Sequence, residues 1–112
     1  MISKTEQSFF LKYLGDNPKI RIIDFLMDNF AHDFSLPQIA IGSNVAYTTL
    51  IDLLPKLLKQ GIIAETRKIG KSRLYKINLD NSIAKAFFAI DMKLSEVAIE
   101  SVSKNKLLVQ ND

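Results

Sequence analysis

Apolar residues recur at intervals of three and four along several stretches of the chain, the spacing of a helix with one buried face. Residues 18–30 place Ile20, Ile23, Met27 and Phe30 on such a face. Residues 46–60 carry a stripe of leucines, and the longest stretch of this kind covers residues 81–104. The pattern predicts a mainly α-helical protein.

Capping residues place the ends of these helices. Asn17 precedes Pro18, and this pair is typical of a helix start. Ser35 caps a short helix over residues 36–42. Gly61 ends the leucine-striped helix, and Asn81 or Ser82 caps the last one. A further short helix is expected over residues 5–14, ending at Gly15.

Two segments have the character of strands. Residues 62–69 and 73–79 surround Gly-Lys-Ser at 70–72, and Tyr75, Ile77 and Leu79 alternate with polar residues. The glycine suits a hairpin turn, while residues 31–34 predict a connector or a short strand. Two short helices around a tight turn, followed by a hairpin, predict a winged helix-turn-helix with a long C-terminal helix.

A length of 112 residues suits one domain with a single core. Within it we expect an N-terminal helix (1–15), a winged-helix core (18–79), a dimerisation helix (81–104) and a tail (105–112). The chain has no cysteine and no apolar run long enough to cross a membrane. We therefore expect a soluble cytoplasmic protein without membrane contact.

Positive charge is concentrated in one part of the chain. Residues 56–76 contain seven basic residues and one acid, a net charge of +6, although the whole chain carries only +3. Such a basic block indicates a polyanionic partner, or a solvated charged surface.

Gly-Lys-Ser can also end a phosphate-binding loop of nucleotide hydrolases. That motif requires a glycine at position 65, where this chain has Glu65, and it requires a helix after the lysine, where a strand is predicted here. His32 is the only histidine and has no cysteine or carboxylate cluster at metal-ligand spacing, and no catalytic constellation stands out. We expect neither an enzyme nor a cofactor nor a metal site.

The run "LPQIAIGSNVAYTTLIDLLPKLLKQGIIAETRKIGKSRLYKIN" resembles the winged-helix transcriptional regulators of bacteria and archaea, of the arsenic-repressor-like and multiple-antibiotic-repressor-like groups. The segment "LPKLLKQGII…TRKIGKSRLYKINLDN" is most similar to small archaeal regulators. The resemblance implies double-stranded DNA as the partner. It also implies that helix 46–60 enters the major groove while residues 67–73 hold the backbone or minor groove. The resemblance does not indicate which small-molecule effector, if any, the protein binds.

Position 46 is alanine, so Ser43 or Asn44 is expected to hold the turn, and Pro55 removes one hydrogen bond inside the helix. Asp52 can accept from a cytosine, or it can pair with Lys56 instead. The candidate DNA-binding residues are Ser43, Asn44, Tyr47, Thr48, Thr49, Ile51, Asp52, Lys56, Arg67, Lys68, Lys71, Ser72 and Arg73.

The last helix has more apolar surface than one small core needs. Ile83, Phe87, Ile90, Leu94, Val97 and Ser101 form a heptad-like seam, and Ala84, Phe88, Ala98 and Val102 add a second edge. Plain core packing is one interpretation, and a homodimer is the one we favour. The expected interface residues are Phe9, Phe10, Tyr13, Phe87, Ile90, Leu94 and Val97.

The function that these patterns favour is a sequence-specific, DNA-binding transcriptional regulator. A winged helix can also serve as a protein-interaction module of a larger assembly. A third possibility is a DNA-packaging protein without sequence preference.

Overall fold

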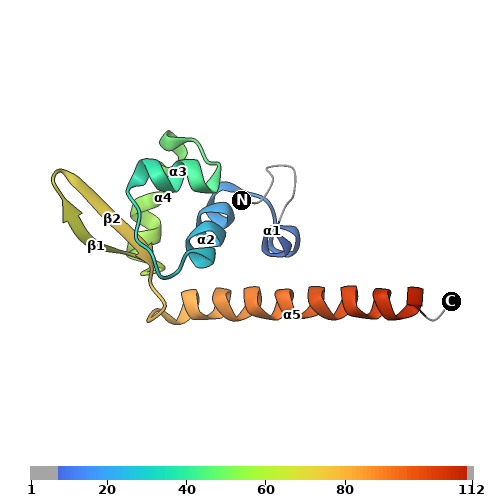
Figure 1. Ribbon diagram of the computed structural model, residues 1–112. Coiled ribbons are helices and arrows are strands. Elements are labelled where there is room, and N and C mark those ends of the chain that lie inside the picture. The colour runs from blue at the N-terminus through green and yellow to red at the C-terminus, as the bar shows by residue number, and fades with distance from the viewer. Residues whose placement is uncertain (1–7, 111–112) are drawn as a thin grey trace.

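The computed structural model describes residues 8–110, and the side chains of residues 8–100. In this part of the chain, five helices and a two-stranded sheet follow one another as α1 (Phe9–Leu14), α2 (Pro18–Asp28), α3 (Leu36–Ser43), α4 (Tyr47–Lys59), β1 (Ile63–Ile69), β2 (Ser72–Ile77) and α5 (Ser82–Gln110). Figure 1 shows α1 to β2 gathered into one body, with α5 running beneath it and extending past it. The predicted winged helix-turn-helix, mainly α-helical with a small hairpin and a long last helix, is confirmed.

The predicted caps start the helices. The Asn17 side chain accepts a hydrogen bond from the backbone N–H of Ile20 at 3.0 Å, which begins α2. Ser35 and Gln38 form a reciprocal capping box at the start of α3. Asn81 accepts from the backbone N–H groups of residues 83 and 84, so Asn81 caps α5. Local chemistry therefore determines these three helix starts.

Three boundaries differ from the prediction. Helix α2 ends at Asp28, and Phe30, predicted on the buried face, is 46% exposed with its ring edge-on to Phe88 of α5. Helix α5 continues to Gln110 instead of ending at residue 104. The first helix was expected to begin at residue 5, which lies outside the described residues. Within the described residues, α1 begins at Phe9.

The core lies between α2, α3, α4 and the hairpin. Its fully buried side chains are Ile22, Ile23, Leu26, Met27, Ile39, Leu50, Leu57, Ile63 and Ile77. Helix α3 approaches α2 closely at Gly42, where a Cβ would lie 2.3 Å from the ring of Phe25. A larger residue at position 42 would therefore have to displace the Phe25 ring.

The hairpin is tied to the core by its second strand. Strands β1 and β2 pair antiparallel, with Ile69 opposite Ser72 across a two-residue turn in which Gly70 has a φ of 61°. Tyr75 of β2 exchanges two backbone hydrogen bonds of 2.8 Å with Phe34, so the predicted connector at 31–34 contributes one bridge of a third strand. Tyr75 and Ile77 are buried, as predicted, and they anchor the hairpin to the body.

Candidate nucleic-acid interface

The turn between α3 and α4 is held by backbone geometry rather than by a cap on α4. Asn44 has a left-handed conformation (φ 56°, ψ 48°), and its N–H bonds to carbonyls at the end of α3. The Arg21 guanidinium, which also pairs with Asp16, donates to the Asn44 carbonyl at 2.9 Å. Ala46 makes no side-chain cap on α4. The direction of α4 therefore depends on Asn44 and on Arg21, a residue that the sequence patterns did not indicate.

Ser43 has a different role from the one predicted. Its side chain is buried, and its hydroxyl donates to the Ile39 carbonyl at 2.6 Å within α3. The prediction of Ser43 as a DNA contact was wrong, because a hydroxyl turned back into its own helix cannot reach a ligand. Asn44, the next residue, is exposed.

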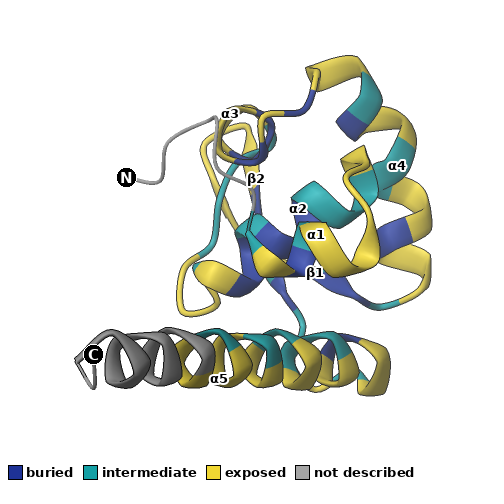
Figure 2. Ribbon diagram, turned by 90° about the vertical axis from the view of Figure 1, so that its right-hand side faces the viewer, coloured by how far each residue is buried: buried dark blue, intermediate teal, exposed yellow. Residues whose placement is uncertain are grey.

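Helix α4 has one face against the core and one toward solvent, and Figure 2 shows it along one side of the body with exposed residues on its outer side. Leu50 and Leu57 are fully buried, whereas Leu58, predicted in the same stripe, is 37% exposed. The helix continues through Pro55. The outer face carries the exposed candidates Tyr47, Thr48, Ile51, Asp52 and Lys56, with Thr49 half-buried.

The acidic candidate Asp52 and the basic candidate Lys56 on α4 do not form an ion pair with each other. Among the ion pairs of the described residues, none joins Asp52 to Lys56, so both side chains face solvent separately. The alternative interpretation of Asp52, as a helix-stabilising partner of Lys56, is therefore not supported by the structure.

Two of the four candidate cations of the wing are already paired with acids. The Arg67 guanidinium bonds both carboxylate oxygens of Asp33, at 2.9 and 3.2 Å, and the Thr66 hydroxyl donates to the same carboxylate at 2.6 Å. The hydrogen bonds from Arg67 and Thr66 lower the pKa of Asp33 to about 2. Arg73 lies 3.4 Å from Glu65 across the hairpin. Both arginine side chains stay largely exposed, at 61% and 59%, although each is paired with an acid.

Lys68 and Lys71 are the other two cations, and both are exposed near the hairpin tip. No described acid lies within ion-pair distance of either ammonium group. Ser72 is exposed beside them. The wing therefore presents two lysines whose charge is balanced only by solvent ions.

A shallow depression lies beside the turn, between the ends of α3 and α4. Its most exposed apolar side chain is Ile41, at 83%, which stands next to the candidate Asn44 and Tyr47. Ile41 was not among the predicted site residues, and only the structure shows that it faces outward beside the buried Ala40. The lining residues are Pro37, Ala40, Ile41, Asn44, Val45, Ala46 and Tyr47.

The predicted interface residues of the terminal helices separate into two groups. Phe10 is fully buried, with its ring edge-on to Phe87 at 5.9 Å between centroids, so its prediction as an interface residue was wrong. Phe87 and Leu94 are half-buried, and Phe87 packs on the core. The remaining four, Phe9, Tyr13, Ile90 and Val97, are exposed.

The residues of α5 that contact the body are not the same set as those of the predicted seam. Ala84 is fully buried and Phe88 packs on the core, whereas Ile83, from the seam, is 52% exposed. Ser101 and Val102 belong to α5, but their side chains lie outside the described ones. Both edges therefore contribute to covering the core, through Ala84 and Phe88 of the second edge and Phe87 of the seam, while Ile83, Ile90 and Val97 of the seam stay exposed.

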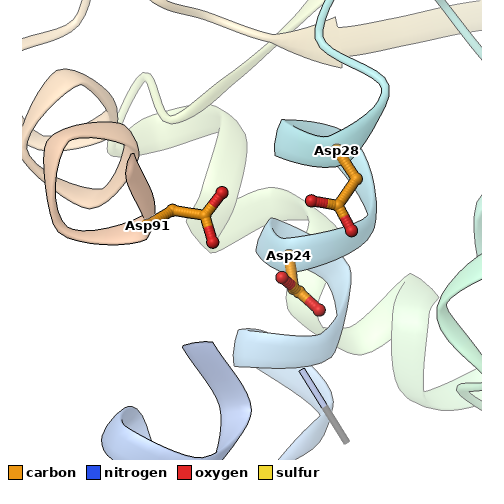
Figure 3. Close-up of side chains that lie close together, drawn as sticks. All are labelled: Asp24, Asp28 and Asp91. Carbon is orange, nitrogen blue, oxygen red and sulfur yellow. The ribbon is translucent and has the colours of Figure 1, made fainter. Parts of the chain in front are cut away.

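Three aspartates come together between α2 and α5, and the sequence analysis did not foresee this. Asp24 and Asp28, one turn apart on α2, meet Asp91 of α5 (Figure 3). Loss of hydration is the main cause that raises the pKa of each carboxyl group; for Asp28, whose residue is exposed as a whole, the partial desolvation of its carboxyl group and the charges of Asp24 and Asp91 raise the pKa to about 6. An aspartate directly after two buried isoleucines, at Ile22-Ile23-Asp24, was the signal available in the sequence.

The fold and these surfaces define a winged helix-turn-helix protein of the type found in transcription regulators. The structure is similar to MepR, a transcription regulator of the Staphylococcus aureus multidrug efflux pump MepA, with a TM-score of 0.61 and 13% identity over 90% of this chain and 77% of that one. It is equally similar to NadR, solved with 4-hydroxyphenylacetate, with 18% identity over 91% and 74% of the two chains and a TM-score of 0.61. Sso10a-2, a DNA-binding protein of Sulfolobus solfataricus, gives a TM-score of 0.50, with 16% identity over 82% of this chain and 96% of that one.

No family model and no curated protein matches the sequence. At these identities the likeness to solved structures establishes the fold alone. None of the helices in the described part of the chain combines the length and the apolar character needed to cross a bilayer.

Proposed function

We propose that this protein is a sequence-specific, double-stranded DNA-binding transcriptional regulator that acts in the cytoplasm. The observation that carries the proposal is the exposed outer face of α4, which follows a rigid turn and belongs to the same body as a hairpin with two unpaired lysines. A helix presented in this way fits the major groove, and lysines at a hairpin tip fit backbone phosphates.

In this proposal, residues in the first turns of α4 contact the base edges. Tyr47 and Thr48 stand at the start of the helix, and Ile51 offers a methyl group to a thymine one turn later. Asn44, Thr49, Asp52 and Lys56 border this surface. Lys68, Lys71 and Ser72 contact phosphates, whereas Arg67 and Arg73 first have to leave Asp33 and Glu65.

We also propose a homodimer through α5. Ile83, Ile90 and Val97 are exposed and seven residues apart, so they form one stripe along the helix. Phe9 and Tyr13, at 47% and 67% exposed, add apolar surface on α1, which packs beside α5. A two-fold dimer would present two copies of α4 to a symmetric DNA site.

Selection of bound duplexes from a random pool tests the proposal. We expect enrichment of a defined, two-fold symmetric motif, and an affinity that falls steeply with salt. Tyr47→Ala should change the selected motif, since a residue at a base edge alters specificity. Binding without enrichment would point to DNA packaging, and absence of duplex binding at low salt would point to a protein-interaction module; either result would refute the proposal.

A further inference from the structure

The three aspartates between α2 and α5, Asp24, Asp28 and Asp91, are called here the aspartate cluster. One carboxylate oxygen from each lies within 4.8 Å of those of the other two. Figure 3 shows the Asp91 carboxyl group pointing from α5 toward the carboxyl groups on α2. The cluster thus spans the junction at which the winged-helix body meets the long helix.

A second observation concerns an unsatisfied buried atom. Asp24 is only 9% exposed, and its Oδ1 atom is buried without a hydrogen-bond partner among the described residues. The other oxygen, Oδ2, accepts from the Ser8 hydroxyl at 2.9 Å. An ionised oxygen removed from water requires a compensating partner, because its lost hydration is otherwise not replaced.

Nothing in the described chain supplies that partner. No described lysine, arginine or histidine lies within ion-pair distance of any carboxylate of the cluster. Three acids therefore share a small space with no protein cation, and their mutual repulsion adds to the cost of burying Asp24.

We propose that the aspartate cluster is a binding site for a hard divalent cation of the size of Ca²⁺. Carboxylate oxygens are the ligands such ions prefer, and the cluster offers no nitrogen or sulfur ligand. Ca²⁺–oxygen distances are about 2.3–2.6 Å, so oxygens within 4.8 Å of one another can all contact one Ca²⁺ ion, and Ca²⁺ accepts irregular coordination more readily than Mg²⁺, which requires a near-octahedral geometry. Asp28 is exposed and Asp91 half-buried, which leaves room for water to complete the coordination.

A cation here would join two elements that the proposed function uses differently. Helix α5 carries the proposed dimer seam, and its cap residue Asn81 donates to the Gln60 carbonyl at the end of α4, at 3.0 Å. Occupation of the site would fix the position of α5 against α2, and therefore the position of one α4 relative to the other in a dimer. The site itself does not depend on DNA binding.

Thermal unfolding of the full chain tests the proposal. After treatment with EDTA at neutral pH, addition of about 5 mM Ca²⁺ should raise Tm by about 5 °C or more, with Mn²⁺ acting similarly and Mg²⁺ less. Asp91→Asn should abolish this rise, and Glu100→Gln, an exposed acid on the same helix, should keep it. Calorimetric titration with CaCl₂ should show one ion per chain in the parent protein and none in Asp91→Asn.

Two results would overturn the proposal. One is a Tm that none of the three cations changes, or that changes equally in Asp91→Asn and the parent. The other is a Tm that rises on acidification to about pH 5 but not with cations, which would mean that a shared proton relieves the cluster instead. Asp28→Asn, at the exposed member, repeats the test if Asp91→Asn fails to fold.

Discussion

The winged-helix body and helix α5 differ in how completely they bury their apolar side chains. In the body, α2, α3, α4 and β2 each place large aliphatic side chains in the core at or near zero exposure, although Ile41, Ile51 and Leu58 stay exposed at 83%, 38% and 37%. Among the described side chains of α5, only Ala84 is completely buried, and Ile83, Ile90, Met92, Val97 and Ile99 are between 39% and 67% exposed. One side of α5 completes the core of the body through Ala84, Phe87 and Phe88, and α5 keeps two exposed apolar flanks.

This difference assigns separate tasks to the two regions. A body whose core is complete can hold a recognition surface rigidly without help from a partner chain. An exposed apolar stripe on a long helix is stabilised by burial against a second surface, so association is its most direct use. The four predictions that follow test this division, beginning with the largest expected effect.

Leu50→Ala should destabilise the body most strongly. Leu50 is fully buried at the centre of the core, and truncation of such a leucine costs about 2–5 kcal/mol in the free energy of unfolding. Urea unfolding followed by circular dichroism measures this loss. Leu58→Ala, on the same helix but 37% exposed, is the matched control and should cost about 1 kcal/mol or less. Equal losses would contradict the self-contained core.

If α5 forms the proposed dimer, Ile90→Lys combined with Val97→Lys should separate it without unfolding the body. Both residues lie on the open stripe of α5, and two buried charges would oppose its association. Sedimentation equilibrium should then give the mass of a single chain, 12.7 kDa, with an unchanged circular dichroism spectrum. Met92→Lys places the same charge on the other flank, and it should leave the mass of the parent dimer intact.

Lys68→Ala combined with Lys71→Ala should weaken DNA binding similarly for all sequences. Each lysine that neutralises a phosphate adds about one unit to the salt dependence of binding, so the slope should fall by about 2. Arg67→Ala is the control, because Asp33 already pairs with Arg67, and it should change the slope by less. Fluorescence anisotropy with a labelled duplex at several salt concentrations gives these slopes.

The smallest expected effect is the acid response of the Asp33–Arg67 pair. The pKa of Asp33 is lowered to about 2, so the stability from this pair is present above about pH 4 and is lost as pH falls toward 2. In Asp33→Asn the urea midpoint should therefore decrease less between pH 4 and pH 2 than in the parent. Asp80→Asn, an exposed acid without an ion pair in the described structure, should follow the parent.

The sequence predicted some of the exposed residues of the candidate site but not others. Tyr47, Thr48, Lys68 and Lys71 lie exposed, as expected from a helix start and a hairpin tip. Ser43 and Phe10 did not follow the prediction, because whether a hydroxyl or an aromatic ring faces inward depends on the neighbouring elements. The pairing of Arg67 with Asp33 joins residues 34 positions apart in the chain, a separation that no local pattern reveals.

By itself the sequence determined the order of the elements, the caps at Asn17 and Ser35, and the hairpin turn at Gly70, and it left the cap of the last helix between Asn81 and Ser82. These features depend on interactions among residues near one another in the chain, so periodicity and capping chemistry suffice to find them. Only the tertiary structure decided which edge of α5 covers the core, which cations of the wing are already paired, and that three aspartates meet between α2 and α5. Each of these is a contact between distant segments, and its outcome depends on how the helices are placed against one another.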